Sequence, residues 1–475
     1  MLFHSVHFLI FFPVVTLLFF LIPKRLRAFW LLVASYYFYM SWNARYALLI
    51  GLSTVVTYAC ALVLARTDKK SVRILSLVCN LALNLGILFF FKYFSFGFDV
   101  LLPVGISFYT FQALGYTIDV YRGDTQAEKN FIRYALFVSF FPQLVAGPIE
   151  RSKRLLTQID AIEEIRVWEY GRITRGLTLM LWGLFIKLVI ADRIAVIADT
   201  VFDAPFGYGS FELLCGAFAF AIQIYCDFNA YSVIAKGAAL VLGFTLMDNF
   251  DTPYLAQNVT EFWNRWHISL STWFRDYVYI PLGGNRKGQL RKYVNLMITF
   301  TLSGIWHGAG LSFVAWGLCH GAMRVMQEML QAPLKKLGDL LHVKRETFSM
   351  KLGKILVTDF CVMLAWVFFR AGSVSRALFC LEKIFTRPNP WALFGGNLYT
   401  LGLDRFECNV LIVALVVLLA HDLYLYLKKE DLPAFLGRQN LWFRWGVIIA
   451  LIVCVLVYGI YGVEFDSSQF IYFQF

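Results

Sequence analysis

The sequence predicts an all-α polytopic membrane protein, and three observations support that prediction. Of its 475 residues, 59% are apolar and only 16% are charged, whereas soluble proteins carry about 25% charged residues. The mean hydropathy of +0.64 is high for a whole chain. Uncharged runs of about 20 residues, long enough for a helix to cross the hydrocarbon core, recur along the whole sequence.

The expected helices follow these uncharged runs in chain order, and together they predict about ten to twelve membrane crossings. We expect one integral-membrane domain over residues 1–475. The runs are Met1–Pro23, Ala28–Ala44, Tyr46–Ala65, Ile74–Phe91, Val100–Ile118, Gly176–Ala191 (interrupted by Lys187), Leu213–Cys226, Tyr293–Met323, Ile355–Phe369 (interrupted by Asp359), Val410–Ala420 with its flanks, and Gly446–Val463.

The basic residues indicate the orientation of the chain. Lys and Arg follow the first and third runs and cluster again between later runs. Cytoplasmic loops of membrane proteins concentrate Lys and Arg, so these segments are expected in the cytoplasm and the N-terminus outside it. No Lys or Arg follows the last run, which predicts that the C-terminus is also outside. The net charge of +12 therefore requires no nucleic-acid partner.

Two segments fit neither a clean span nor a loop. Tyr134–Ile149 is apolar but contains Pro142 and a Gly147-Pro148 break, which predicts a re-entrant or broken helix. Phe262–Gly284 is dense in Trp, Tyr, Arg and His, as is typical of an interfacial or protein-buried helix. Irregular backbone at membrane depth survives only where protein or a water-filled cavity surrounds it. We therefore expect the functional cavity near these segments.

Two of the seven histidines are candidate catalytic residues. His307 lies in Ser303-Gly-Ile-Trp-His-Gly-Ala-Gly310, within the charge-free stretch Tyr293–Met323, and His267 lies in the dense aromatic segment. Glycines around His307 are expected to loosen the helix and admit a substrate. A neutral imidazole can take a proton from a hydroxyl, although a hydrogen-bonded packing role is the alternative for each histidine. The remaining histidines are expected to be structural: His4, His7, His320, His342 and His421.

A second polar constellation surrounds Asp227. Asp227, Asn229 and Tyr231 interrupt apolar sequence and are candidates to line the same cavity, but a hydrogen-bond cluster between helices explains them equally well. The nine cysteines are scattered without a metal-ligand spacing, so they are expected to pack as apolar side chains and no metal site is predicted. The sequence has no P-loop, Rossmann glycine pattern or nucleophile-elbow motif.

Two long motifs resemble the signatures of bacterial membrane-bound O-acyltransferases. The first covers residues 261–286 and begins Glu261-Phe-Trp-Asn-Arg-Trp-His267; the second is Leu302-Ser-Gly-Ile-Trp-His307-Gly-Ala. The most similar branch is the alginate O-acetyltransferase-like group, and the teichoic-acid D-alanyl transferase is a more distant relative. Shorter matches extend the resemblance over most of the chain: Pro103-Val-Gly-Ile-Ser-Phe, Phe140-Phe-Pro-Gln-Leu-Val-Ala-Gly-Pro148, Asp227-Phe-Asn-Ala-Tyr-Ser and Asn249-Phe-Asp-Thr-Pro-Tyr254.

This resemblance implies acyl transfer across the membrane by a ring of about ten to twelve transmembrane helices, with re-entrant segments around a central cavity. The second-signature histidine, His307, is implied to be the catalytic base, and the first-signature histidine, His267, its essential companion. Further residues in or beside the matched motifs are implied to contact substrate: Asp227, Trp266, Arg275, Asp276 and Trp306.

The resemblance also implies substrates and partners. The donor is acetyl-CoA or another acyl thioester, including an acyl carrier, on the cytoplasmic side, and no cofactor is tightly bound. A separate extracytoplasmic esterase-like (SGNH-type) partner finishes transfer to an exported or cell-envelope polysaccharide, outside the inner membrane of a bacterium. Two alternatives stay open, D-alanyl transfer to teichoic acid and a polytopic transporter or export scaffold. A transporter is expected to show two similar halves, and no such repeat is found in the sequence.

The C-terminal tail, residues 464–475, carries no basic residue and is expected on the outer face. Its aromatic side chains suit an anchor at the membrane interface. The spacing Phe470-x-Tyr472-x-x-Phe475 also resembles the tail motif of the small partner in the D-alanyl system, whose tyrosine carries the acyl group. The resemblance implies that Tyr472 relays the acyl group after His307 deprotonates its hydroxyl.

Overall fold

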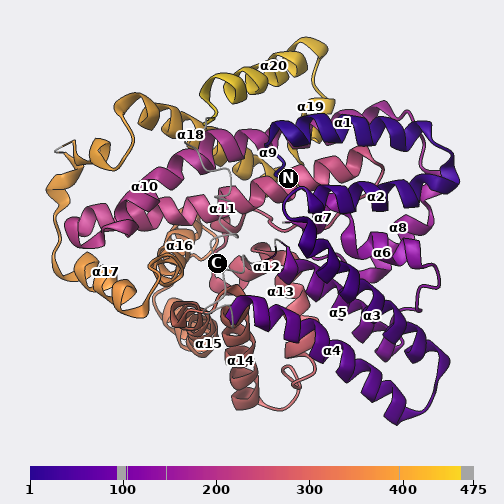
Figure 1. Ribbon diagram of the computed structural model, residues 1–475. Coiled ribbons are helices and arrows are strands. Elements are labelled where there is room, and N and C mark those ends of the chain that lie inside the picture. The colour runs from indigo at the N-terminus through magenta and orange to yellow at the C-terminus, as the bar shows by residue number, and fades with distance from the viewer. Residues whose placement is uncertain (94–102, 104, 146, 395, 462–475) are drawn as a thin grey trace. The chain divides into compact units, whose positions relative to one another are not determined.

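The computed structural model describes residues 1–93, 103, 105–145, 147–394 and 396–461, and every regular element in them is a helix (Figure 1). The described chain divides into two compact units. The first unit consists of Met1–Leu184 and Tyr231–Asp248, and the second consists of Phe185–Ala230 and the residues from Asn249 onward. The all-α, polytopic fold class that the sequence predicts is confirmed.

The helices of the first unit run from α1 to α9, with the C-terminal part of α11. Their bounds are α1 (Val6–Leu21), α2 (Arg27–Met40), α3 (Ala47–Arg66), α4 (Lys70–Tyr93), α5 (Ile106–Arg122), α6 (Phe131–Ser139), α7 (Phe141–Leu144), α8 (Ser152–Asp160), α9 (Tyr170–Phe185) and α11 (Ser210–Val241).

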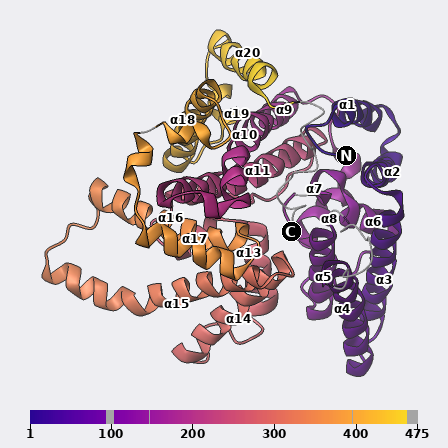
Figure 2. The same cartoon turned by 60° about the vertical axis from the view of Figure 1, so that its left-hand side comes forward.

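Helices α3, α4 and α5 lie side by side, as both views show (Figures 1 and 2). A buried polar ladder joins them. Ser53 donates to the side-chain oxygen of Asn84 at 2.5 Å, Thr57 donates to that of Asn80 at 3.0 Å, and Asn80 donates to Thr117 at 2.7 Å. Such hydrogen bonds between helices hold apolar bundles together because lipid supplies no hydrophobic force between them.

The broken helix expected within Tyr134–Ile149 is confirmed. α6 ends at Ser139 and α7 begins at Phe141, because Phe140 adopts a non-helical conformation with φ −53° and ψ 108°. Pro142 lies in the first turn of α7, where the missing N–H of proline removes no intrahelical hydrogen bond.

The helices of the second unit begin with α10 and include the N-terminal part of α11. A π-helical segment, Ile186–Ala191, precedes α10, and a second one, Arg275–Tyr279, follows α13. The remaining bounds are α10 (Asp192–Asp203), α12 (Val259–Arg265), α13 (Ile268–Phe274), α14 (Gln289–His307), α15 (Leu311–Leu340), α16 (Phe348–Arg370), α17 (Val374–Thr386), α18 (Arg405–Lys428), α19 (Leu432–Gly437) and α20 (Leu441–Tyr458).

Within the described residues, six helices are long and apolar enough to cross a membrane. The expectation of ten to twelve crossings counted shorter runs as well, among them α1 and α2, which have 16 and 14 residues. These six are Ala44–Arg66, Lys70–Tyr93, Ser210–Val241, Phe348–Arg370, Arg405–Lys428 and Leu441–Tyr458.

The charge-free stretch Tyr293–Met323 does not form one span. It divides after His307 into α14 and α15, which form a hairpin (Figures 1 and 2). Of the glycines around His307, Gly304 does not loosen α14, which runs unbroken to His307, and Gly308 lies where the helix ends. The lack of side chains on these glycines allows α15 to pack closely against α14. A Cβ on Gly304 would lie 2.3 Å from the carbonyl oxygen of Phe313, and one on Gly308 would lie 2.2 Å from the Phe313 ring.

Candidate active site

His307 is the last residue of α14 and is only 7% exposed. Its Nδ1 lies 2.7 Å from the backbone carbonyl oxygen of Ser303. A carbonyl oxygen only accepts hydrogen bonds, so Nδ1 carries the hydrogen, and the lone pair of the neutral imidazole is on Nε2. His307 therefore has the tautomer that a general base requires.

Aromatic rings surround this imidazole. The ring centroids of Trp306, Trp316 and Phe369 lie 4.7, 4.9 and 5.3 Å from that of His307. The Trp306 ring is also 6.1 Å from the ring of His267, so one indole contacts both candidate histidines. The two signature motifs, which are separate in the sequence, thus contribute to one site.

His267 lies at a break between two short helices. Asn258 caps the start of α12 by accepting from the N–H of Glu261 at 2.9 Å, and α12 ends at Arg265. His267 then adopts the left-handed conformation, with φ 41° and ψ 54°, before α13 begins at Ile268. This backbone costs a residue other than glycine roughly 1–2 kcal/mol, so the surrounding structure must hold it in place.

The preceding loop supplies that support from both sides of His267. The carbonyl oxygen of Asn249 accepts from the N–H of Ile268 at 2.9 Å, and its side-chain oxygen accepts from the Ser269 hydroxyl at 2.6 Å. The N–H of Asp251 donates to the carbonyl oxygen of Arg265 at 3.0 Å. Sequence reasoning assigned no role to Asn249 or Asp251, although both stand in the matched motif Asn249-Phe-Asp-Thr-Pro-Tyr254.

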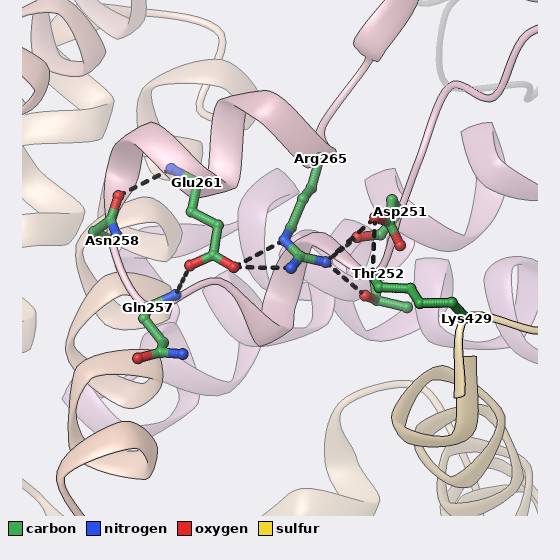
Figure 3. Close-up of polar contacts among 7 residues, drawn as sticks. All are labelled: Asp251, Thr252, Gln257, Asn258, Glu261, Arg265 and Lys429. Carbon is green, nitrogen blue, oxygen red and sulfur yellow. Dashed lines mark hydrogen bonds and ion pairs between the residues drawn. The ribbon is translucent and has the colours of Figure 1, made fainter. Parts of the chain in front are cut away.

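The Arg265 guanidinium group stabilises the break between α12 and α13 by hydrogen bonds (Figure 3). It donates twice to Glu261 Oε1, from Nη2 at 2.8 Å and from Nε at 3.1 Å, and it donates to the carbonyl oxygen of Asp251 at 3.0 Å. Lys429, just beyond α18, forms an ion pair with the Asp251 carboxylate at 3.3 Å. The Arg265 guanidinium also lies 5.0 Å above the Tyr426 ring, which ties the end of α18 to the segment that carries His267.

His267 itself is 1% exposed, and the ring of Phe228 meets it edge-on at a centroid distance of 4.6 Å. Burial lowers the pKa of His267 well below its ordinary value, and the charge of a protonated His307 lowers it further. The neutral form of the His267 imidazole is therefore the favoured one in this site.

His320, on α15, was expected to be structural, and the structure places it next to the site. It is fully buried, and its Nδ1 accepts from the Trp263 indole N–H at 3.2 Å. The Trp316 ring lies between the two histidines, 4.9 Å from His307 and 5.0 Å from His320. An indole N–H only donates, so neutral His320 carries its hydrogen on Nε2, the opposite tautomer to that of His307.

A cavity of about 550 Å³ lies between α12, α13, α14 and α15. Ser303 lines it, and the Ser303 carbonyl is the hydrogen-bond partner of His307. One residue that lines the cavity is therefore hydrogen-bonded to the candidate base. Its polar and basic lining residues are Asn264, Ser271, Thr272, Arg275, Thr299, Ser303 and Arg324.

Of the predicted substrate contacts, Arg275 lines this cavity and pairs with Asp276 at 2.8 Å. Trp266 is buried among aromatic rings, with Phe250 and Trp366 each at 5.0 Å. Tyr472 lies outside the described residues, so its predicted role stays a prediction.

Asp227 is buried in an ion cluster that sequence reasoning missed. Lys187 lies 2.6 Å from Asp227 and 2.7 Å from Asp192, and all three side chains are buried. The sequence showed Lys187 only as an interruption of an apolar run. Tyr231 belongs to the first unit, where its hydroxyl lies 3.2 Å from Nδ1 of His4.

Comparison with known proteins agrees with the two signatures. The model of the MBOAT, membrane-bound O-acyltransferase family matches residues 126–357. A probable alginate O-acetylase, AlgI of Pseudomonas putida, is 36% identical over 499 residues and 99% of each chain. Peptidoglycan O-acetyltransferase of Helicobacter pylori is 35% identical over 395 residues, covering 74% of this chain and 72% of that protein. Teichoic acid D-alanyltransferase of Bacillus subtilis is more distant, at 26% over 248 residues, 49% of this chain and 60% of that protein.

The long apolar helices and the match to the family are those of a multi-pass membrane protein with two buried histidines in one aromatic site. The chain belongs to the membrane-bound O-acyltransferase family and is an acyltransferase. The family resemblance drawn from the sequence is confirmed, and the transporter alternative is set aside.

Proposed function

We propose that this enzyme moves an acetyl group from cytoplasmic acetyl-CoA across the bacterial inner membrane, for O-acetylation of an exported or cell-envelope polysaccharide. His307 is the general base in this proposal, and His267 is its companion. The observation that carries it is the hydrogen bond from His307 Nδ1 to the Ser303 carbonyl at 2.7 Å, because this bond leaves the basic lone pair of the neutral imidazole on Nε2.

The proposed chemistry is the transfer of an acyl group from a thioester to a hydroxyl. His307 Nε2 removes the proton from the acceptor hydroxyl, and the oxygen of that hydroxyl forms a bond to the thioester carbonyl carbon. The resulting tetrahedral intermediate then loses its carbon–sulfur bond, and the proton held on His307 passes to the departing thiolate. Ester and thiol are the products. A thioester is already activated, so this reaction needs no ATP.

The cavity lined by Ser303 supports a route for the donor. Arg275 and Arg324 lie on its wall, and guanidinium groups attract phosphate groups such as those of coenzyme A. Trp306, which contacts both histidines, is proposed to confine the acyl group between them. The predicted substrate contacts of Asp227, Trp266 and Asp276 stay predictions.

Acetyl is the proposed acyl group because the Pseudomonas putida and Helicobacter pylori relatives, both above 30% identity, are named for O-acetyl transfer, whereas the D-alanyl transferase shares 26% over about half of this chain. The relatives named for alginate and peptidoglycan also support a polysaccharide acceptor. An extracytoplasmic esterase-like partner of the SGNH type is proposed to complete the transfer.

The proposed function is tested with His307→Ala and His267→Ala, with the acetyl content of envelope polysaccharide measured by mass spectrometry. Removing a general base lowers a rate by ~10²–10⁴, so the His307 variant should lose nearly all acetylation at normal protein amounts. His421→Gln is the matched control, because His421 is a half-buried histidine that pairs with Asp422 and is not part of the candidate site. Wild-type acetylation by the His307 variant would refute the assignment of the base.

The tail relay is a separate proposal with its own test. Tyr472→Phe keeps the aromatic ring and therefore any anchoring role, but it removes the hydroxyl that would carry the acyl group. Loss of transfer in this variant, with an acyl-tyrosine detected in the wild type, supports the relay. Undiminished transfer leaves only the anchor.

The orientation with both termini outside is also proposed, on the distribution of basic residues. The orientation is measured with single cysteines introduced into a cysteine-free variant, by testing whether a membrane-impermeant thiol reagent labels each of them in intact cells. Labelling is expected at position 2 and after Phe475, and none near Lys70. Labelling near Lys70 in intact cells contradicts the orientation.

A further inference from the structure

A buried cluster of three charges lies in the second unit. The Lys187 ammonium contacts Asp192 Oδ1 at 2.7 Å and Asp227 Oδ1 at 2.6 Å, and all three residues are at most 3% exposed. Charges this deep in an apolar protein require close partners. The contact with Asp227 joins the π-helical segment Ile186–Ala191 to α11, so it fixes the position of α11 along that segment.

The π-helical geometry is what brings the cluster together. The N–H of Asp192 donates to the carbonyl oxygen of Lys187, five residues earlier, so the two side chains stand on the same side of the chain. The last described residues also bind here: the N–H of Ile460 donates to the carbonyl oxygen of Leu188 at 3.1 Å, and Arg193 donates to that of Tyr458 at 2.9 Å. Segments of π-helix occur often at functional sites.

The cluster is linked to the candidate active site through the residue that follows Asp227. Phe228 directly follows Asp227, and its ring meets the His267 ring edge-on, at a centroid distance of 4.6 Å and an interplanar angle of 81°. Phe228 is fully buried. A shift of α11 along its axis would therefore move Phe228 against His267, whose backbone is already held in an unfavourable conformation.

We propose that Lys187 is a positioning residue for acyl transfer: its ion pairs with Asp192 and Asp227 hold Phe228 against His267 and so set the orientation of that imidazole. This inference rests on the proposed role of His267 in acyl transfer. Lys187 acts through Phe228, and no contact between Lys187 and the substrate is required.

The first measurement is independent of activity. The full chain carries ¹³Cε1-labelled histidine in nanodiscs, and His267→Gln assigns the His267 signal. Lys187→Met should shift this signal in the same direction as Phe228→Leu does. Asp199→Asn is the matched control, since Asp199 is an α10 carboxylate paired with Arg370, and it should leave the signal in place. If Lys187→Met does not fold, Asp227→Asn, which keeps an oxygen beside Lys187, provides the same comparison.

The second measurement is a double-mutant cycle on acetyl transfer. Lys187→Met should lower kcat by ~10–100-fold with little change in the donor KM, as misplacement of a catalytic group does. Because Lys187 acts through Phe228, the double variant with Phe228→Leu should be no slower than the slower single variant.

An unshifted His267 signal in folded Lys187→Met protein overturns the positioning role, and so do rate losses that multiply in the double variant. If wild-type protein shows no acetyl transfer, the proposed function fails, while the histidine signal still decides whether Lys187 positions His267.

Discussion

Gly304 and Gly317 meet where α14 crosses α15. A Cβ on Gly317 would lie 3.3 Å from the Cα of Gly304 and 2.4 Å from the carbonyl oxygen of Phe300. His307 stands in the next turn of α14, so the closeness of these two backbones sets where the candidate base lies relative to Trp316. Small residues at such crossings are typical of helix pairs in membranes.

Alanine at either glycine is therefore expected to separate the hairpin. Gly304→Ala and Gly317→Ala should each destabilise the protein by ~1–3 kcal/mol, the range for overpacked cores, and should reduce acetylation. Thermal unfolding in detergent and acetyl content measure the two effects. Gly446→Ala on α20 is the control, since a Cβ there meets nothing within 4 Å. Normal stability of both hairpin variants would contradict this account of the crossing.

Arg265 is expected to be irreplaceable by lysine. Lysine cannot reproduce the paired hydrogen bonds to Glu261 together with the bond to the Asp251 carbonyl. Arg265→Lys should lower acetyl transfer by ~10–100-fold, because the segment carrying His267 loses its anchor. Lys429→Ala removes a solvent-exposed ion pair of the same network and the contact of the Lys429 ammonium with the Tyr426 ring. An exposed ion pair is worth ~0–1 kcal/mol, so this variant should have little effect. Full activity of Arg265→Lys would show that a positive charge alone is sufficient at this position.

The tautomer of His320 gives a further prediction. Asparagine places an oxygen near the position of Nδ1 and can still accept from the Trp263 indole, whereas leucine cannot. His320→Leu should therefore destabilise the protein by ~1–3 kcal/mol through an unsatisfied buried donor, and His320→Asn should recover most of that loss. Thermal unfolding of the two variants measures the difference. A His320→Asn variant no more stable than His320→Leu would argue against this hydrogen bond.

Glu150, which follows the break after α7, predicts a pH dependence of stability. Burial raises its pKa to about 7, although the Met247 N–H that donates to its carboxylate and the nearby Arg154 both lower it. The folded-state pKa exceeds the unfolded value of ~4.3, so this group contributes stability at low pH and loses it as pH rises through 7. Relative to Glu150→Gln, the wild type should lose up to ~3 kcal/mol between about pH 4 and pH 8. Parallel unfolding temperatures of the two proteins across that range would disprove this.

The sequence was sufficient for the class of fold and for the two candidate histidines. Apolar runs predict membrane helices directly, and the signature motifs single out His267 and His307. What the motifs could not supply is why His267 lies at a helix break, since the supporting bonds come from Asn249 and Asp251 in another segment.

Other parts of the site depend on contacts between distant segments. Lys187 and Asp227 are 40 positions apart, and no helical or strand periodicity links them. His320 has no polar neighbour in sequence that marks it. Only the packing of α15 on α14 brings it near His307, with the Trp316 ring of its own helix in contact with both histidines. The division of Tyr293–Met323 into two helices was also missed, because the absence of charge suggested one span, although Gly308-Ala-Gly310 marks the position of the turn.

The left-handed backbone at His267 makes the residue needed for acyl transfer different from the residue that gives the highest thermal stability. Glycine adopts φ 41° without the strain that a histidine bears, so His267→Gly should raise the unfolding temperature relative to His267→Ala while both lack the imidazole. A library at this position selected only for heat resistance should accumulate glycine and asparagine and lose transfer activity. Selection for acetylation should restore histidine, at the expense of thermal tolerance.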